Sequence, residues 1–182
     1  MANNPAHHTA QLALRGSAGR LWSDLHRPAE GSGALLVYLS DPAGPLVEPA
    51  ALGTHAGLMV LVSRPTTPHD AIDVVEWAAE HAAELDADPD RLLVGGEHRG
   101  AAFTAAVARQ ARDDGWPDLL RQVLVAPPPA TEACGGTAPA TVVGDPGYAQ
   151  RLRQAGVAVE EVAGGTDLPV RLGAALRLHA AR

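Results

Sequence analysis

The sequence predicts an α/β fold in which a mostly parallel sheet is covered by helices on both faces. Short apolar runs such as 34–39 (ALLVYL) and 57–62 (GLMVLV) have the uninterrupted hydrophobic character of strands buried on both sides. They alternate with segments such as 70–85, in which apolar residues recur at helical spacing. Strands that alternate with helices form parallel units, and 182 residues suffice for one domain. We therefore expect a single domain over 11–182, preceded by a flexible segment 1–10.

The individual elements follow from turn residues and periodicity. Segments 11–15 and 20–26 flank the glycine-containing turn 16–19 and are expected to form an N-terminal hairpin. Segment 41–56 is rich in Pro and Gly and is expected to be a loop with at most one short helix, whereas Asp70 is a candidate N-cap. The remaining strands are expected at 91–95, 122–126, 140–143 and 157–162, and the remaining helices at about 100–112, 148–155 and 169–181.

The composition excludes several kinds of chemistry. All 14 basic residues are Arg, so Schiff-base catalysis, a lysine-anchored pyridoxal phosphate and a lysine-containing P-loop are absent. A net charge of −7 and 3% aromatic residues argue against a nucleic-acid partner. Cys134 is the single cysteine, so neither an intramolecular disulfide nor a thiolate metal site can form. We expect no cofactor, no metal and a small-molecule ligand.

The expected location is the cytoplasm. Residues 1–12 contain no basic segment followed by an apolar core, and no apolar run approaches the length of a membrane span, so neither a signal peptide nor a membrane partner is expected. Abundant Ala and Arg with a single Ile favour a GC-rich genome, such as that of an actinobacterium.

The most informative segment is 91–108 (RLLVGGEHRGAAFTAAVA). A buried strand runs through Gly96-Glu97-His98-Arg99-Gly100 directly into a helix of small residues. Flanking glycines allow a strand to turn sharply into a helix and to hold the central residue in a strained conformation above the sheet, as in the nucleophile elbow GxSxG. The central residue here is His98.

This segment and its surroundings resemble the bacterial hormone-sensitive-lipase-like esterases of the α/β-hydrolase fold. The phrases that carry the resemblance are 88–92 (DPDRL), 96–101 (GEHRGA) and 122–127 (QVLVAP), and they occur in the family's order. The resemblance extends over roughly 12–180 and is strongest over 75–127. It implies the α/β-hydrolase fold and, in the family, ester hydrolysis by a Ser-His-acid triad.

The chain departs from that family at the catalytic positions. His98 stands where the family has its nucleophilic serine, and 40–45 (SDPAGP) stands where its HGGG oxyanion loop should appear. Asp167 falls near the position of the family histidine, and Asp145 is the possible counterpart of the acid. The connection after Pro127 is short, so we expect a reduced or absent cap.

The candidate site follows from these positions. All five serines lie between 17 and 63, which predicts that the protein is not a serine hydrolase. His98 is the candidate proton-transfer or hydrogen-bonding group, with Asp145 and Asp167 as further catalytic candidates. The alternative is that position 98 merely tolerates a positive φ angle, since His is enriched there. The expected ligand-binding groups are Glu97, Arg99, Ser40, Asp41 and Gly44, and the expected structural elbow residues are Gly96 and Gly100.

Three functional hypotheses remain at this point. The leading one is a non-hydrolytic lyase- or cyclase-type enzyme that acts on a small apolar intermediate of secondary metabolism by elimination, cyclisation or cycloaddition. The second is an inactive pseudo-hydrolase that binds a ligand or a partner protein, and the third is an unconventional esterase. The exposed strand 157–162 and the last helix are candidates for a homodimer contact.

Overall fold

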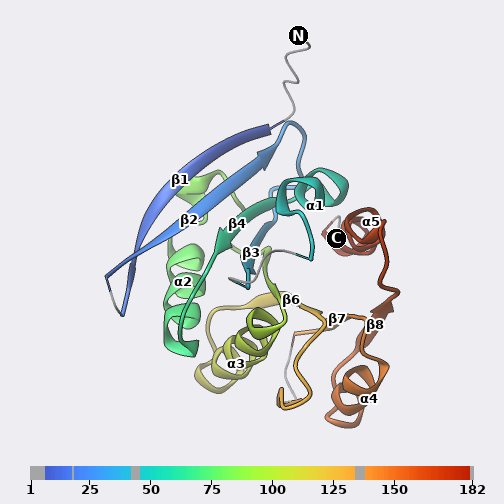
Figure 1. The fold of residues 1–182 in the computed structure, drawn as a ribbon. Helices are drawn as coiled ribbons and strands as arrows, with labels where there is room; N and C mark the ends of the chain where they lie inside the picture. Colours follow the sequence, from blue (N-terminus) through green and yellow to red (C-terminus); the bar gives the residue numbers. More distant parts are fainter. Residues whose placement is uncertain (1–6, 18, 42–45, 134–137, 181–182) are drawn as a thin grey trace.

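The computed structural model in Figure 1 describes residues 7–17, 19–41, 46–133 and 138–180. Its sheet has eight strands in the order β1-β2-β4-β3-β5-β6-β7-β8. Strand β2 is antiparallel to both of its neighbours, β1 and β4, and all other neighbouring strands are parallel. The predicted mostly parallel α/β architecture with an N-terminal hairpin is therefore confirmed. The strands are β1 (His7–Gly16), β2 (Gly19–Pro28), β3 (Leu35–Leu39), β4 (Met59–Ser63), β5 (Leu92–Glu97), β6 (Leu119–Val125), β7 (Ala140–Val143) and β8 (Val159–Val162). The helices are α1 (Pro49–Ala56), α2 (Pro68–Glu80), α3 (Arg99–Asp114), α4 (Pro146–Gln154) and α5 (Leu168–Ala180), with a 3-10 turn at Ala83–Leu85.

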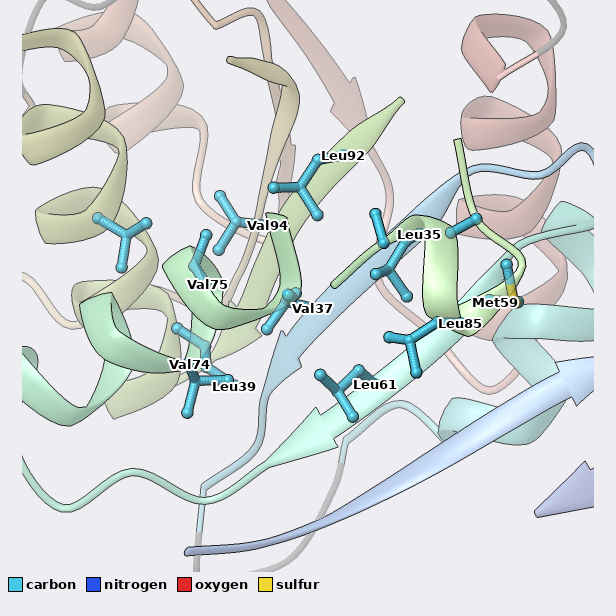
Figure 2. Close-up of a cluster of buried hydrophobic side chains, with 14 of the residues drawn as sticks. Leu35, Val37, Leu39, Met59, Leu61, Val74, Val75, Leu85, Leu92 and Val94 are labelled. Atoms are coloured by element: carbon cyan, nitrogen blue, oxygen red, sulfur yellow. The ribbon is translucent and has the colours of Figure 1, made fainter. Parts of the chain in front are cut away.

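Both faces of the sheet are buried against helices. Neighbouring residues of β3 belong to different clusters of buried hydrophobic side chains. Val37 packs with Val74 and Val75 of α2, and Leu36 packs with Leu172 of α5. Figure 2 shows Val37 beside the α2 valines. Because side chains alternate across a strand, a run without polar residues fits a strand that is covered on both sides.

Several element boundaries differ from the expected ones. Strand β1 begins at His7, inside the segment expected to be flexible, because it pairs with β2 along its whole length. Helix α2 begins at Pro68 and ends at Glu80, so the expected single helix to residue 85 is divided. The described part of the connection between β6 and β7, 126–133 and 138–139, contains no helix. No helix among the described residues is long and apolar enough to cross a membrane.

Asp70 has a different role from the expected N-cap. Thr67 is the N-cap of α2, and Asp70 completes a capping box by accepting a hydrogen bond from the Thr67 amide at 3.2 Å. The Asp70 carboxylate also accepts from the Thr66 hydroxyl at 3.0 Å and from the Ser17 amide at 2.7 Å. Since Ser17 lies in the hairpin turn, Asp70 ties the hairpin to α2.

The hydrogen bonds of the Asp70 carboxylate predict that the free energy of unfolding depends on pH. Burial by itself raises the pKa of Asp70, but the hydrogen bonds from Ser17, Thr66 and Thr67 outweigh it and hold the pKa well below its ordinary value. The stabilisation is therefore complete above the unfolded-state pKa of about 4 and is lost as the pH falls toward the lower folded-state pKa. We expect Asp70→Asn to lower the free energy of unfolding by about 2 kcal/mol at pH 7 and by much less at pH 3.

Urea unfolding of the wild type and the variant at both pH values checks this expectation. Asp118→Asn, at an exposed position, is the matched control and should change stability by less than about 0.5 kcal/mol. An equal destabilisation by Asp70→Asn at pH 7 and pH 3 would show that the charge of Asp70 is not what ties the hairpin to α2.

Candidate functional site

The sharp turn between β5 and α3 is the centre of the candidate site. His98 occupies this turn with φ 48° and ψ −117°, a conformation that is strained for a residue with a side chain. Its amide donates to the Val125 carbonyl at 3.0 Å, and its carbonyl accepts from the Ala101 amide at 3.0 Å. The turn is thereby fixed to both β6 and α3. Because β5 is a central parallel strand, His98 lies at the carboxyl edge of the sheet, where ligands of open α/β sheets bind.

The two elbow glycines are required by close backbone contact. A Cβ atom at Gly100 would overlap the carbonyl oxygen of Leu39 in the neighbouring strand β3. A Cβ atom at Gly96 would lie 2.7 Å from that same oxygen and 2.5 Å from the Gly100 carbonyl. Helix α3 can therefore start directly against the end of β3 only if both positions lack a side chain.

Glu97 precedes His98 and points into the protein, although it was expected among the ligand-binding groups. Its carboxylate is completely buried. Oε2 accepts hydrogen bonds from the Tyr38 hydroxyl at 3.0 Å and from the amides of Leu46 and Val47 at 2.7 and 3.2 Å, and Oε1 accepts from the Ser40 hydroxyl at 3.3 Å. Glu97 therefore connects the end of β3 to the start of the segment that leads into α1.

Tyr38 was not among the expected site residues. Burial, the nearby Glu97 charge and the hydrogen bond to it raise the pKa of the Tyr38 hydroxyl well above its ordinary value. The phenol therefore stays a hydrogen-bond donor to Glu97 at neutral pH. The signal in the sequence is a hydroxyl within the otherwise apolar run 35–39, because a buried polar group needs a partner.

Asp41 and Arg99 meet at the start of α3. The Arg99 amide donates to Asp41 Oδ2 at 3.3 Å, whereas the His98 side chain makes no capping hydrogen bond to the helix. The Arg99 guanidinium lies over the Phe103 ring, 5.6 Å from its centroid. The structure thus brings Ser40 into contact with Glu97 and Asp41 into contact with Arg99, next to His98 in the chain, and a ligand-binding role for these residues stays a prediction. Gly44 and Cys134 lie outside the described residues.

The two other acidic candidates have local roles in the structure. Asp145 is the N-cap of α4 and accepts a hydrogen bond from the Tyr148 amide at 2.8 Å. Asp167 forms an exposed ion pair with Arg171 at 2.7 Å, one helical turn further along the chain. No contact of either carboxylate with His98 is recorded among the described residues, and a catalytic role for them stays a prediction.

Ala126 is a second strained residue beside the elbow. It follows β6 with φ 45°, and its amide donates to the Val143 carbonyl at 3.0 Å. Glycine adopts this conformation without steric cost, so we expect Ala126→Gly to raise the free energy of unfolding by about 0.5 kcal/mol. Ala106→Gly, within α3, should instead lower it by about 1 kcal/mol, and denaturant unfolding of both variants checks the opposite signs. Destabilisation by both would contradict the strain at Ala126.

A small hollow begins one helical turn from His98. Its volume is about 280 Å³, its floor includes Ala102, Ala105 and Ala106 of α3, and its other side includes Thr131. An exposed ion pair between Arg109 and Glu132, 2.6 Å long, borders it. A larger hollow of about 500 Å³ lies between the hairpin turn and α2. The smaller one is the closer of the two to His98 along the chain, and its volume is just below the usual range of small-molecule sites.

Comparisons with known proteins agree with this architecture. The family described as alpha/beta hydrolase fold matches residues 63–147. Carboxylesterase NlhH of Mycobacterium tuberculosis is 33% identical over 91 residues, which are 46% of this chain and 28% of that protein. The carboxylic ester hydrolase LipN of the same organism is 30% identical over 141 residues, which are 64% of this chain and 37% of LipN. The matched stretches thus span well under half of these curated relatives.

Solved structures with the same fold cover nearly the whole chain. Esterase LipW from Mycobacterium marinum has a TM-score of 0.79 and 21% identity, over 95% of this chain and 82% of LipW. An esterase from Pyrobaculum calidifontis has a TM-score of 0.81 and 18% identity, over 99% of this chain and 88% of that esterase. At such identities the likeness shows the fold alone.

The named relatives correct three of the functional expectations. The leading hypothesis of a lyase or cyclase is contradicted, because the matching proteins are named carboxylesterases and esterases. The pseudo-hydrolase hypothesis and the expectation that the chain is not a serine hydrolase are contradicted by the same names. Ester hydrolysis, the third hypothesis, is the better supported one. The chain is therefore a protein of the α/β-hydrolase fold, and its resemblance to the bacterial hormone-sensitive-lipase-like esterases is confirmed.

Proposed function

We propose that this chain is a carboxylic ester hydrolase in which His98 is the general base. The observation that carries the proposal is the elbow geometry, which places residue 98 on a strained turn at the carboxyl edge of the sheet, beside the Arg99 amide. The names of the matching relatives support ester hydrolysis as the reaction. Histidine is the most frequent general base in enzymes, so a histidine at this position is compatible with acyl transfer.

The reaction has two steps. A hydroxyl group of the protein attacks the acyl carbon and passes its proton to a ring nitrogen of His98, the carbon–oxygen bond to the alcohol breaks, and the alcohol leaves with that proton. Water then attacks the acyl-enzyme in the same way, which releases the carboxylic acid and regenerates the hydroxyl group. In both steps the Arg99 amide donates a hydrogen bond to the negative oxygen of the tetrahedral intermediate. No cofactor is needed for this balance.

We propose the hollow lined by Ala102 as the pocket for the acyl group. It begins one turn along α3 from His98, is floored by alanines and has a volume of about 280 Å³. A short acyl chain fits these dimensions and this apolar floor. We therefore expect short-chain esters to be better substrates than long-chain ones.

Hydrolysis of p-nitrophenyl butyrate tests the role of His98. His98→Ala should reduce kcat/KM by about 100-fold or more, since it removes the general base. The control is His69→Ala, because His69 is 76% exposed at the start of α2, and it should leave kcat/KM within twofold of the wild type. Equal activity of wild type and His98→Ala would exclude His98 as the reacting group.

The acyl intermediate identifies the nucleophile directly. Mass spectrometry of protein quenched during turnover should place the acyl group on a serine. Ser40 is the serine beside the elbow, and its hydroxyl is buried and donates to Glu97 at 3.3 Å. An acyl group on His98, with no serine labelled by a fluorophosphonate, would show that the imidazole is the nucleophile and would overturn the role of His98 as general base.

A further inference from the structure

We propose that Asp41 is a specificity residue that makes the site select uncharged esters. The inference rests on the proposed function, because it concerns the amide that would stabilise the oxyanion. The Asp41 carboxylate accepts a hydrogen bond from the Arg99 amide at 3.3 Å, so the protein already places a negative oxygen where negative charge develops during acyl transfer.

Asp41 is held in this place by its neighbours in the chain. The Ser40 amide donates to the Ser63 carbonyl at 2.9 Å, and the Ser40 hydroxyl donates to Glu97. Both hydrogen bonds fix the backbone immediately before Asp41 at the end of β3. The close contact of Gly100 with Leu39 fixes the start of α3 against the same strand. The carboxylate and the Arg99 amide are thus positioned by two adjacent, rigid elements.

The contact between Asp41 and the Arg99 amide also supplies a hydrogen-bond acceptor to the start of α3. The first amides of a helix have no partner within it, and the His98 side chain makes no capping hydrogen bond. The Asp41 carboxylate supplies one partner from another segment, and its charge is favourable at the positive end of the helix dipole. An oxyanion at the elbow therefore has to displace a carboxylate from its hydrogen bond.

Two consequences follow for the reaction. The competition lowers the rate with every ester, because an ionised acceptor binds an amide more strongly than a neutral one does. An ester with a carboxylate on its acyl group brings a further negative charge toward Asp41, and like charges repel. Uncharged esters are therefore the preferred class of substrate.

Kinetics with matched esters test the selection. Asp41→Asn keeps an oxygen that can accept from the Arg99 amide but removes the charge. We expect it to raise kcat/KM for p-nitrophenyl butyrate about tenfold, and to raise kcat/KM for the carboxylate-bearing p-nitrophenyl hemisuccinate more than that. The control is Asp118→Asn, which removes the same charge at the opposite edge of the sheet, before β6 begins. An unchanged preference between the two esters in Asp41→Asn would overturn the proposal.

A binding measurement that needs no turnover separates this proposal from the proposed function. Titration with butyrate, followed through the Arg99 amide resonance in ¹⁵N-labelled protein, should shift that resonance in Asp41→Ala and leave it nearly unchanged in the wild type. Equal shifts of the Arg99 resonance in the two proteins, or no shift in either, would overturn the proposal that Asp41 competes for the Arg99 amide. His98→Ala could retain full activity while butyrate shifts the Arg99 amide resonance in Asp41→Ala and not in the wild type. The proposed role of His98 would then fail, but the proposal that Asp41 competes for the Arg99 amide would stand.

Discussion

Replacing Gly100 with alanine is expected to lower the free energy of unfolding by about 5 kcal/mol or to prevent folding. The added Cβ would overlap the Leu39 carbonyl oxygen, and the atoms that would have to move are backbone atoms of a helix and a central strand. Neither element can shift without breaking contacts of the sheet, because interiors are closely packed. This substitution therefore tests whether the elbow has the geometry described above.

Denaturant unfolding measures the effect, and Gly164→Ala is the matched control. Gly164 is exposed, and no atom lies within 4 Å of the position of an added Cβ, so the same chemical change should alter stability by less than about 0.5 kcal/mol. If Gly100→Ala does not fold, its soluble yield should be lower than that of the wild type. Gly100→Ser, which adds the same Cβ atom, should also give a lower soluble yield than the wild type. A Gly100→Ala protein as stable as the wild type would refute the close contact between α3 and β3.

Replacing Glu97 with alanine is expected to lower the free energy of unfolding by about 4 kcal/mol. The carboxylate accepts hydrogen bonds from the hydroxyls of Tyr38 and Ser40 and from the amides of Leu46 and Val47. Each buried donor that loses its acceptor costs about 1–3 kcal/mol, and alanine also leaves a cavity. Glu97→Gln keeps one acceptor oxygen and should cause a smaller loss.

A double-mutant cycle isolates the contact between Glu97 and Tyr38. Tyr38→Phe removes one donor and should cost about 1 kcal/mol, whereas Tyr38→Phe combined with Glu97→Gln should cost less than the sum of the single changes. Additive effects would indicate that the hydroxyl and the carboxylate do not interact. Urea unfolding at pH 7 gives all four stabilities.

The same variants report on the candidate site. Ser40 precedes Asp41, and Glu97 precedes His98, so the Glu97 hydrogen bonds hold the backbone on both sides of the Asp41 contact with Arg99. We expect Glu97→Gln to lower kcat for p-nitrophenyl butyrate, even where the protein is fully folded. Glu97 would then be a positioning residue, because its carboxylate faces the interior and not the substrate.

The sequence by itself determined the alternation of strands and helices and the elbow at 96–100. These features are local, because an uninterrupted apolar run specifies a buried strand and two glycines around one residue permit a sharp turn. Strand β7, Ala140–Val143, has the expected boundaries. Even the short connection after β6 could be inferred from the number of residues before the next apolar run.

The tertiary structure decided what the polar side chains do. Glu97 and Ser40 are 57 positions apart, and Asp41 and Arg99 are 58 apart, so their contacts exist only because β3 and β5 are neighbours in the sheet. Asp70 bonds to Ser17 across 53 positions for a similar reason, since α2 packs beside the hairpin turn. Periodicity places a residue on a face of its own element, but the partner of a buried carboxylate depends on which distant element packs against that face.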